Sequence, residues 1–246
     1  MSDDAASMPP ARGAYRPLYA QVRDALVKRL VDGVWLPAQM LPSEFELAGE
    51  LGVSQGTVRK ALDALAAENL VVRRQGRGTF VAEHDEARIL FQFFKLLPDS
   101  GEAAFPESKV VSARLAAATD DEARVLGLQT GADVYRIGRV RSLGGRPIIA
   151  ERVTLPAALF PGLIEESVPN NLYGLYASRY GVTVARAHER LKAVALSSES
   201  ALLLEVGESR PALLIDRVAF ALSGEPVEWR VSHCLTDDFH YSSDLK

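Results

Sequence analysis

Cysteine and histidine are scarce in this chain, which has one cysteine and four histidines in 246 residues. A single cysteine excludes a disulfide within the chain and a cysteine zinc cluster, so we expect Cys234 to be a buried hydrophobe. His233 has no second histidine or cysteine at ligand spacing, and no metal or cofactor is expected. No apolar run approaches the ~20 residues that span a bilayer. Residues 1–14 lack a signal-peptide pattern and are expected to be disordered, which favours a cytoplasmic protein without a membrane partner.

The charge of the chain is unevenly distributed. The net charge is −4, yet residues 54–80 contain five basic and two acidic residues, whereas residues 83–246 contain 18 basic and 23 acidic residues. A basic segment attached to an acidic remainder favours a protein with one DNA-facing end. A patchy solvated surface is the alternative, and charge alone does not separate the two.

Residues 41–81 predict two short helices joined by a tight turn. Ser43 and Glu46 form a capping-box pattern for the first helix, and Ser54 suits the N-cap of the second. Gly52 between the helices suits the positive φ of a helix-ending turn. Apolar residues at helical spacing give each helix a buried face, with Leu47, Ala48 and Leu51 in the first and Val58, Ala61, Leu62 and Leu65 in the second.

The polar face of the second helix and the hairpin after it predict a DNA-binding surface. Residues 71–81 form two short strands around a basic glycine turn, the wing of a winged helix. A helix over residues 17–33, with Leu18, Val22, Leu26 and Leu30 on one face, completes a three-helix core. Residues expected at phosphates and base edges are Ser43, Ser54, Gln55, Gly56, Thr57, Arg59, Lys60, Gly76, Arg77 and Gly78.

The remainder of the chain predicts a second domain of the α+β class. We place the first domain at residues 15–82, a linker at 83–90 and the second domain at 91–242. Turn signals, of which Gly144-Gly145 is the strongest, separate strands from short helices in an antiparallel or mixed sheet. Strands are expected at residues 90–97, 108–118, 134–143, 146–155, 182–196, 212–222 and 227–235, and helices at 119–126, 157–164, 172–180 and 197–206.

Short motifs in both halves follow the order typical of one family. In the first half they are Leu41-Pro42-Ser43-Glu44, Leu51-Gly52-Val53-Ser54, Thr57-Val58-Arg59-Lys60-Ala61-Leu62 and Gly76-Arg77-Gly78-Thr79-Phe80-Val81. In the second half they are Arg139-Val140-Arg141, Pro147-Ile148, Leu155-Pro156, Leu159-Phe160-Pro161, Leu172-Tyr173, Tyr180-Gly181 and Gly224-Glu225-Pro226-Val227-Glu228. The chain resembles the GntR regulators of the HutC subfamily, which join a winged helix-turn-helix to a UTRA domain with the chorismate-lyase fold. The resemblance implies a homodimeric repressor that binds a palindromic double-stranded DNA operator and is controlled by a small effector.

Two positions depart from the family's pattern. Phe45 and Gln55 stand where family members often carry arginines that are used on DNA, whereas Arg59 matches. We expect Phe45 to be a packing residue of its helix. Gln55 suits adenine recognition or a phosphate bond, so the operator is expected to differ or the affinity to depend more on Arg59 and Arg77.

Arg139 and Arg141 are two residues apart on an expected strand, so their side chains share one face. Two converging guanidiniums suit a carboxylate or phosphate ligand. The resemblance implies that the effector binds there, with Glu151 and Glu228 as acceptors. An exposed charged face is the alternative. Further candidates are Arg230 and the start of a helix at Asn171 and Tyr173, where the alternatives are an N-cap and a core aromatic.

The register of the hairpin decides whether Glu151 joins the arginines. A two-residue turn that pairs Leu143 with Arg146 turns Glu151 to the opposite face, whereas a bulged turn that pairs Ser142 with Arg146 brings it to their face. We expect the bulged turn, because it gathers the charges.

Two other functions remain open at this point. One is a chorismate-lyase-like enzyme fused to a DNA-binding module, which the lack of a readable nucleophile–base pair or metal set disfavours. The other is a DNA-binding protein whose second domain only dimerises. The interpretation we adopt is a non-enzymatic transcription regulator with a small anionic effector.

Overall fold

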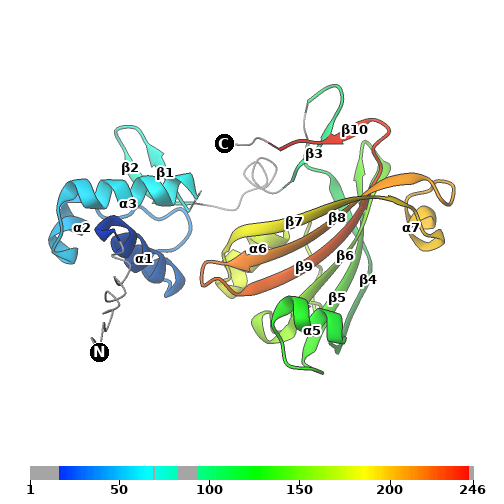
Figure 1. The fold of residues 1–246 in the computed structure, drawn as a ribbon, viewed down its shortest axis with the longest axis horizontal. Coiled ribbons are helices and arrows are strands. Elements are labelled where there is room, and N and C mark those ends of the chain that lie inside the picture. The colour runs from blue at the N-terminus through cyan, green and yellow to red at the C-terminus, as the bar shows by residue number, and fades with distance from the viewer. Residues whose placement is uncertain (1–16, 69, 83–93, 103, 244–246) are drawn as a thin grey trace, which may run out of the picture.

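The computed structural model describes residues 17–68, 70–82, 94–102 and 104–243. Three helices and a two-stranded sheet form one unit, and a six-stranded sheet with short helices forms the other (Figure 1). The expected linker, the first 16 residues, Phe91 and Phe93 lie outside the described residues.

The N-terminal helices are α1 (Leu18–Val31), α2 (Glu44–Leu51) and α3 (Gln55–Ala67). The predicted capping box is present, because Ser43 accepts from the Glu46 backbone while the Glu46 carboxylate accepts from that of Ser43. Gly52 ends α2 at φ 64°. The predicted faces of α2 and α3 are buried, except that Leu51 is only partly buried, whereas Leu18 on α1 is 46% exposed.

The wing consists of β1 (Val71–Arg74) and β2 (Gly78–Val81), which pair antiparallel. A single bridge between Met40 and Phe80 ties the segment before α2 to the wing. The three helices and the first wing strand share one hydrophobic core, which includes Leu26, Leu47, Leu62 and Val71. Helix α3 and the wing are therefore fixed to the same hydrophobic core.

The second unit is an antiparallel six-stranded sheet in the order β4-β5-β6-β9-β8-β7. Its strands are β4 (Glu107–Ala117), β5 (Asp133–Leu143), β6 (Arg146–Pro156), β7 (Val184–Ala195), β8 (Pro211–Ala221) and β9 (Pro226–Cys234). The helices are α5 (Asp120–Leu126), α6 (Leu172–Tyr180), α7 (Ser198–Leu203) and the 3-10 turn η1 (Ala157–Leu159). The α+β class is confirmed.

The two faces of the sheet have different partners. Helix α6 packs Tyr173 and Tyr176 onto a core with Ile137 and Val153. Residues of α5 and α7 instead pack with side chains of opposite strand parity, such as Val134 and Ala150. The face under α6 therefore continues into the row that carries the predicted arginines.

Two predicted elements differ from the structure. The strand expected at residues 90–97 is limited, among described residues, to β3 (Leu96–Pro98), which pairs with the unpredicted strand β10 (Phe239–Tyr241). The helix expected at residues 157–164 is only the single turn η1, because Pro161 and Gly162, at φ 72°, do not continue a helix.

The predicted bulge exists, but its predicted position was wrong. The turn pairs Leu143 with Arg146 and has the two residues Gly144 and Gly145. The register shifts further along, where Ser142 pairs with Pro147 and Arg141 pairs with Ile149. Ile148 is the extra residue, and its insertion brings Glu151 opposite Arg139.

Candidate functional site

The first half of α3 presents a polar, exposed face. Ser54 caps the helix by accepting from the Thr57 backbone N–H at 3.2 Å, and its hydroxyl lies 2.8 Å from that of Thr57. Gln55, Gly56, Arg59 and Lys60 are exposed on the same turns, and Gly76, Arg77 and Gly78 are exposed at the tip of the wing. The predicted DNA-binding residues of α3 and the wing tip are thus accessible to solvent, as a DNA contact requires.

Glu44 organises two of the arginines on this surface, and the sequence analysis did not assign it a role. Its carboxylate lies 2.9 Å from Arg59 of α3 and 3.3 Å from Arg73 of the wing. Arg73 also contacts Asp63 at 2.8 Å. The Glu44 bond raises the pKa of Arg59, and the carboxylate fixes the direction of both guanidiniums.

The prediction that Phe45 packs inward was wrong, because 76% of its surface is exposed. The face of α2 that packs on the core is occupied by Leu47 and Ala48, and the ring of Phe45 lies outside this face. Elsewhere in this unit, two basic side chains lie over rings, with Lys60 over Tyr19 at 4.4 Å and Arg74 over Phe80 at 4.8 Å.

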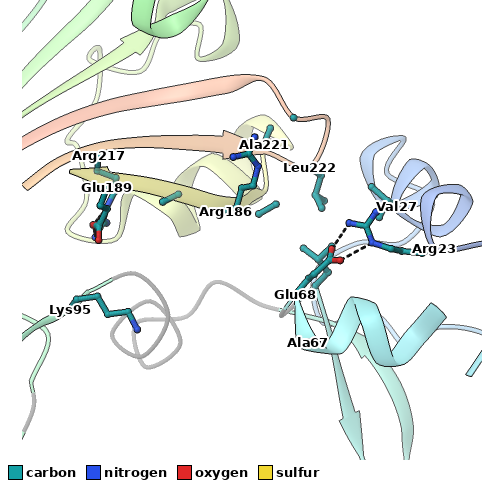
Figure 2. A pocket seen from close by; sticks show the side chains of 14 residues that line it. Arg23, Val27, Ala67, Glu68, Lys95, Arg186, Glu189, Arg217, Ala221 and Leu222 are labelled. Carbon is teal, nitrogen blue, oxygen red and sulfur yellow. Dashed lines mark hydrogen bonds and ion pairs between the residues drawn. The ribbon is translucent and has the colours of Figure 1, made fainter. Parts of the chain in front are cut away.

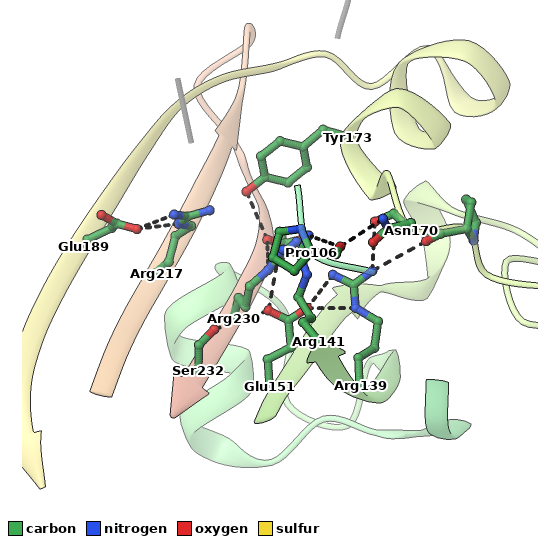
Figure 3. A network of polar contacts seen from close by, with 12 residues as sticks. Pro106, Arg139, Arg141, Glu151, Asn170, Tyr173, Glu189, Arg217, Arg230 and Ser232 are labelled. Carbon is green, nitrogen blue, oxygen red and sulfur yellow. Dashed lines mark hydrogen bonds and ion pairs between the residues drawn. The ribbon is translucent and has the colours of Figure 1, made fainter. Parts of the chain in front are cut away.

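The second candidate site is a cluster of buried charges beside α6 (Figure 3). Arg139 is 1% exposed and donates through Nε to Glu151 at 2.8 Å. It also donates to the backbone oxygen of Asn170 at 3.2 Å. Burial alone raises the pKa of Glu151, but the charges of Arg139 and Arg230 outweigh burial and hold it below its usual range.

Glu228 is the second buried carboxylate of the cluster. It accepts from the hydroxyls of Tyr173 at 3.1 Å and Tyr176 at 2.9 Å, and from Arg230 at 2.7 Å. Burial and the charge of Glu228 raise the pKa of Tyr173 to about 12, so the phenol stays protonated as a donor. Asn171 caps α6 by accepting from Gly174 at 2.8 Å. In the structure, Asn171 is therefore the N-cap of α6 and Tyr173 is a buried aromatic residue.

Arg141 is buried without a carboxylate bonded to it among the described residues. Within the described part of the chain, Arg141 donates to the backbone oxygen of Pro106 at 3.3 Å and its Nε has no partner. The guanidinium lies over the ring of Phe94, at 5.0 Å, and over the ring of Phe105, at 4.5 Å. Burial and the neighbouring arginines lower the pKa of Arg141 to about 9, which leaves it charged at neutral pH.

Further members of the cluster were missed by the sequence analysis. Arg217 of β8 donates to Glu189 of β7 at 2.6 Å, and the Tyr241 hydroxyl donates to the same carboxylate. Asn170 donates to the Pro106 carbonyl at 3.0 Å, while its side-chain oxygen has no partner. Arg217 was detectable as a charged residue between Ile215 and Ala219 on the buried face of an expected strand.

Several hollows adjoin these charges. Arg139, Arg141, Asn170 and Tyr173 line a cavity of about 20 Å³, space for about one water molecule. A cleft of about 650 Å³ lies between the two units, with the Arg23–Glu68 pair on one side and Lys95, Glu189 and Arg217 on the other (Figure 2). Arg217 lines both the cavity and the cleft.

The remaining observations concern metal ligands, membrane spans and the single cysteine. Across the described ranges, no group of three or more metal-ligating side chains is arranged to hold an ion. None of the described helices is both long enough and apolar enough to cross a membrane. Cys234 is fully buried and burial raises its pKa, as predicted for a packing residue.

Comparison with known proteins gives the same two parts. Residues 18–81 match the bacterial regulatory proteins of the gntR family, and residues 103–240 match the UTRA domain. The chain is 30% identical to the HTH-type transcriptional repressor NagR of Bacillus subtilis, covering 86% of this chain and 88% of that protein. It is 31% identical to the histidine utilization repressor of Pseudomonas putida, covering 82% of this chain and 81% of that protein.

Solved structures support the fold. PhnF from Mycobacterium smegmatis has a TM-score of 0.56 and 26% identity, covering 92% of this chain and 99% of that chain. A ligand-binding domain assigned to a GntR-family regulator of Bordetella bronchiseptica has a TM-score of 0.58 and 36% identity, covering 63% of this chain and 98% of that chain. The chain therefore belongs to the GntR family of transcription regulators, in the HutC-type group that joins a winged helix to a UTRA domain.

Proposed function

We propose that this protein is a cytoplasmic, homodimeric repressor that releases a palindromic operator when a small anion binds beside Arg141. Its domains are residues 15–82 and 91–242, and it has no enzymatic activity. Repressors such as NagR, which share its architecture, support the direction of regulation. The main observation in favour of an anionic effector is the buried Arg141, whose Nε lacks a hydrogen-bond partner among the described residues.

The DNA-binding surface consists of α3 and the wing. Arg59, held by Glu44, and Arg77, at the wing tip, supply charge to phosphates, and Gln55 and Thr57 supply hydrogen bonds to base edges. In a helix-turn-helix protein the second helix lies in the major groove, and a dimer places two such helices on two half-sites. The remaining contacts come from Ser43, Ser54, Gly56, Lys60, Gly76 and Gly78.

The charge balance of the buried cluster supports an anionic effector. Four buried arginines face two buried glutamates and the partly buried Glu189, which leaves one positive charge in excess. A buried charge costs several kcal/mol unless it is paired, so a carboxylate or phosphate that reaches Arg141 gains the interaction that the protein leaves unmade. The oxygen of Asn170 offers an acceptor to a hydroxyl of the same ligand. Arg139, Glu151, Glu228, Arg230, Asn171 and Tyr173 complete the site.

The effector site is the small cavity, although the cleft between the units is larger. In the cleft, Arg23 and Glu68 already neutralise each other at 2.6 Å, and Arg217 is paired with Glu189. The small cavity has room for about one water, so binding requires movement of the segments that carry Pro106 and Asn170. This movement links ligand binding to a change of conformation, because a ligand stabilises whichever arrangement it binds better.

DNA binding is tested by mobility shift with duplexes selected from a random pool. We expect binding that weakens steeply as salt rises, because it releases counterions from phosphates. Arg59→Ala is expected to abolish binding, whereas Gln55→Ala mainly changes the preferred sequence. If the protein bound no duplex, or if its affinity did not change with salt concentration, the DNA-binding role would be contradicted.

The effector is sought by thermal shift and turnover assays. Inorganic phosphate, citrate and a panel of small carboxylates and phosphate esters are added to the full chain, and stabilisation identifies a ligand. A ligand that raises the melting temperature and also releases the duplex supports the proposal. Chemical conversion of such a ligand by the pure protein would instead favour the chorismate-lyase-like enzyme.

A further inference from the structure

Phe45 is a large apolar side chain held in solvent at the DNA-facing end of the N-terminal unit. It is 76% exposed and follows Glu44, whose carboxylate contacts Arg59 of α3 and Arg73 of the wing. The ring therefore lies one residue from the point where α2, α3 and the wing meet. An isolated exposed hydrophobic needs no explanation on most surfaces, but this one borders the surface that meets DNA.

We propose that Phe45 contacts the C5-methyl group of a thymine in the major groove and makes the protein select thymine at that position. The proposal rests on the proposed docking of α3 in that groove. A phenyl ring has no hydrogen-bond donor or acceptor, so it cannot bind a phosphate or read a polar base edge. The thymine methyl is the one apolar group that base pairs present in the major groove.

The groups around the ring favour DNA over a second copy of the chain as its partner. Residues 54–80 contain five basic and two acidic residues, and two copies of this surface would repel each other. The carboxylate of Glu44, next to Phe45, is paired with Arg59, whereas Glu46 keeps its charge in the capping box at the start of α2. A polyanion is therefore the complementary partner, and Phe45 is placed at its edge.

Thymine-to-uracil substitution tests the contact, because uracil lacks only the C5-methyl group. The best duplex from a random-pool selection is remade with uracil at each thymine in turn. We expect one position at which the full-length wild-type protein binds the uracil duplex about fourfold more weakly, the value of burying one methyl group. At that position Phe45→Ala should bind both duplexes equally.

The matched control is Leu202→Ala, which removes a side chain that is 79% exposed on α7 in the other unit. This variant is expected to keep the wild-type discrimination. Discrimination that is absent in wild type, or unchanged in Phe45→Ala, overturns the role of Phe45 even if duplex binding is strong and salt-dependent. If the wild-type protein selects no sequence from the pool, the proposed docking of α3 in the major groove is contradicted rather than the role of Phe45. The two outcomes are therefore distinguishable.

Discussion

Arg139 and Glu151 lie directly opposite each other on β5 and β6 because Ile148 is inserted into the ladder between them and the turn. Without that extra residue, the side-chain alternation of the strand would turn Glu151 to the face covered by α5 and α7. The single bulge therefore brings a carboxylate into contact with Arg139 and within 3.6 Å of Arg230. The buried cluster depends on backbone register as much as on residue type.

Glu151→Gln is expected to destabilise the protein by about 3 kcal/mol, because it leaves Arg139 and Arg230 buried without that carboxylate. Urea unfolding at neutral pH measures the change. Glu166→Gln is the matched control, since it removes a carboxylate from the exposed pair with Arg179 and should cost less than ~1 kcal/mol. Equal effects of the two substitutions would show that the buried pair contributes no more than a surface pair.

Arg141→Met is expected to keep or increase the stability of the ligand-free protein while abolishing its response to anions. The substitution removes a buried cation with an unbonded Nε and leaves an apolar side chain beside Phe94 and Phe105. A ligand at 100 times its Kd stabilises the wild type by about 2.7 kcal/mol, a readily measured thermal shift. Arg210→Met, at an exposed pair with Asp237, should keep the full shift. A shift that survives in Arg141→Met would place the anion elsewhere.

Glu122 links the capping box of α5 to Arg136 of β5, and its contribution to stability is expected to depend on pH. The hydrogen bond from Arg136 is the main cause that lowers its pKa, to about 2. A carboxyl group with a lowered pKa stabilises the fold above its unfolded value of about 4.5, and this stabilisation is lost as pH falls toward 2. Glu122→Gln should therefore cost up to about 3 kcal/mol at pH 7, with a loss that shrinks steadily below pH 4.5.

Urea midpoints measured at pH 7, 5, 4 and 3 follow this change. Asp121→Asn serves as the control, because Asp121 pairs with Arg124 on the exposed side of the same helix. A difference between Glu122→Gln and wild type that stays constant with pH would show that the Arg136 pair does not control the titration.

Local patterns predicted the helix ends and most strands of this fold, because their causes are local. Ser43, Ser54 and Gly52 act through bonds and dihedral angles within a few residues. The bulge is different. To bring Glu151 to the face of Arg139, the strand needs one extra residue somewhere between the turn and Glu151, and the sequence does not say where. The structure places it at Ile148, whose packing partners are far away in the sequence.

The buried cluster was predicted only in part for the same reason. Arg139, Arg141 and Glu151 lie on one hairpin, so their common face follows from spacing. Glu189 and Arg217 join them only through the strand order β6-β9-β8-β7, which pairs residues far apart in sequence. The prediction for Phe45 was wrong for a different reason. A phenylalanine on a short helix is usually a core residue, but no part of the described chain covers the ring of Phe45.

Glu44→Gln is expected to increase affinity for random duplexes on the order of threefold and to reduce discrimination between sequences. The substitution removes a negative charge that lies 2.9 Å from Arg59 and 3.3 Å from Arg73, so both guanidiniums become available to phosphates. It also removes the acceptor that fixes the direction of Arg59 on α3, and a mobile phosphate contact holds Gln55 and Thr57 less firmly against the base edges. Titrations of the selected and random duplexes at two salt concentrations measure both effects. Glu50→Gln, on the same helix and paired with Arg29, is the control, and it should alter neither quantity. If Glu44→Gln weakened both duplexes equally, the carboxylate would be a support for the fold rather than the group that aims Arg59.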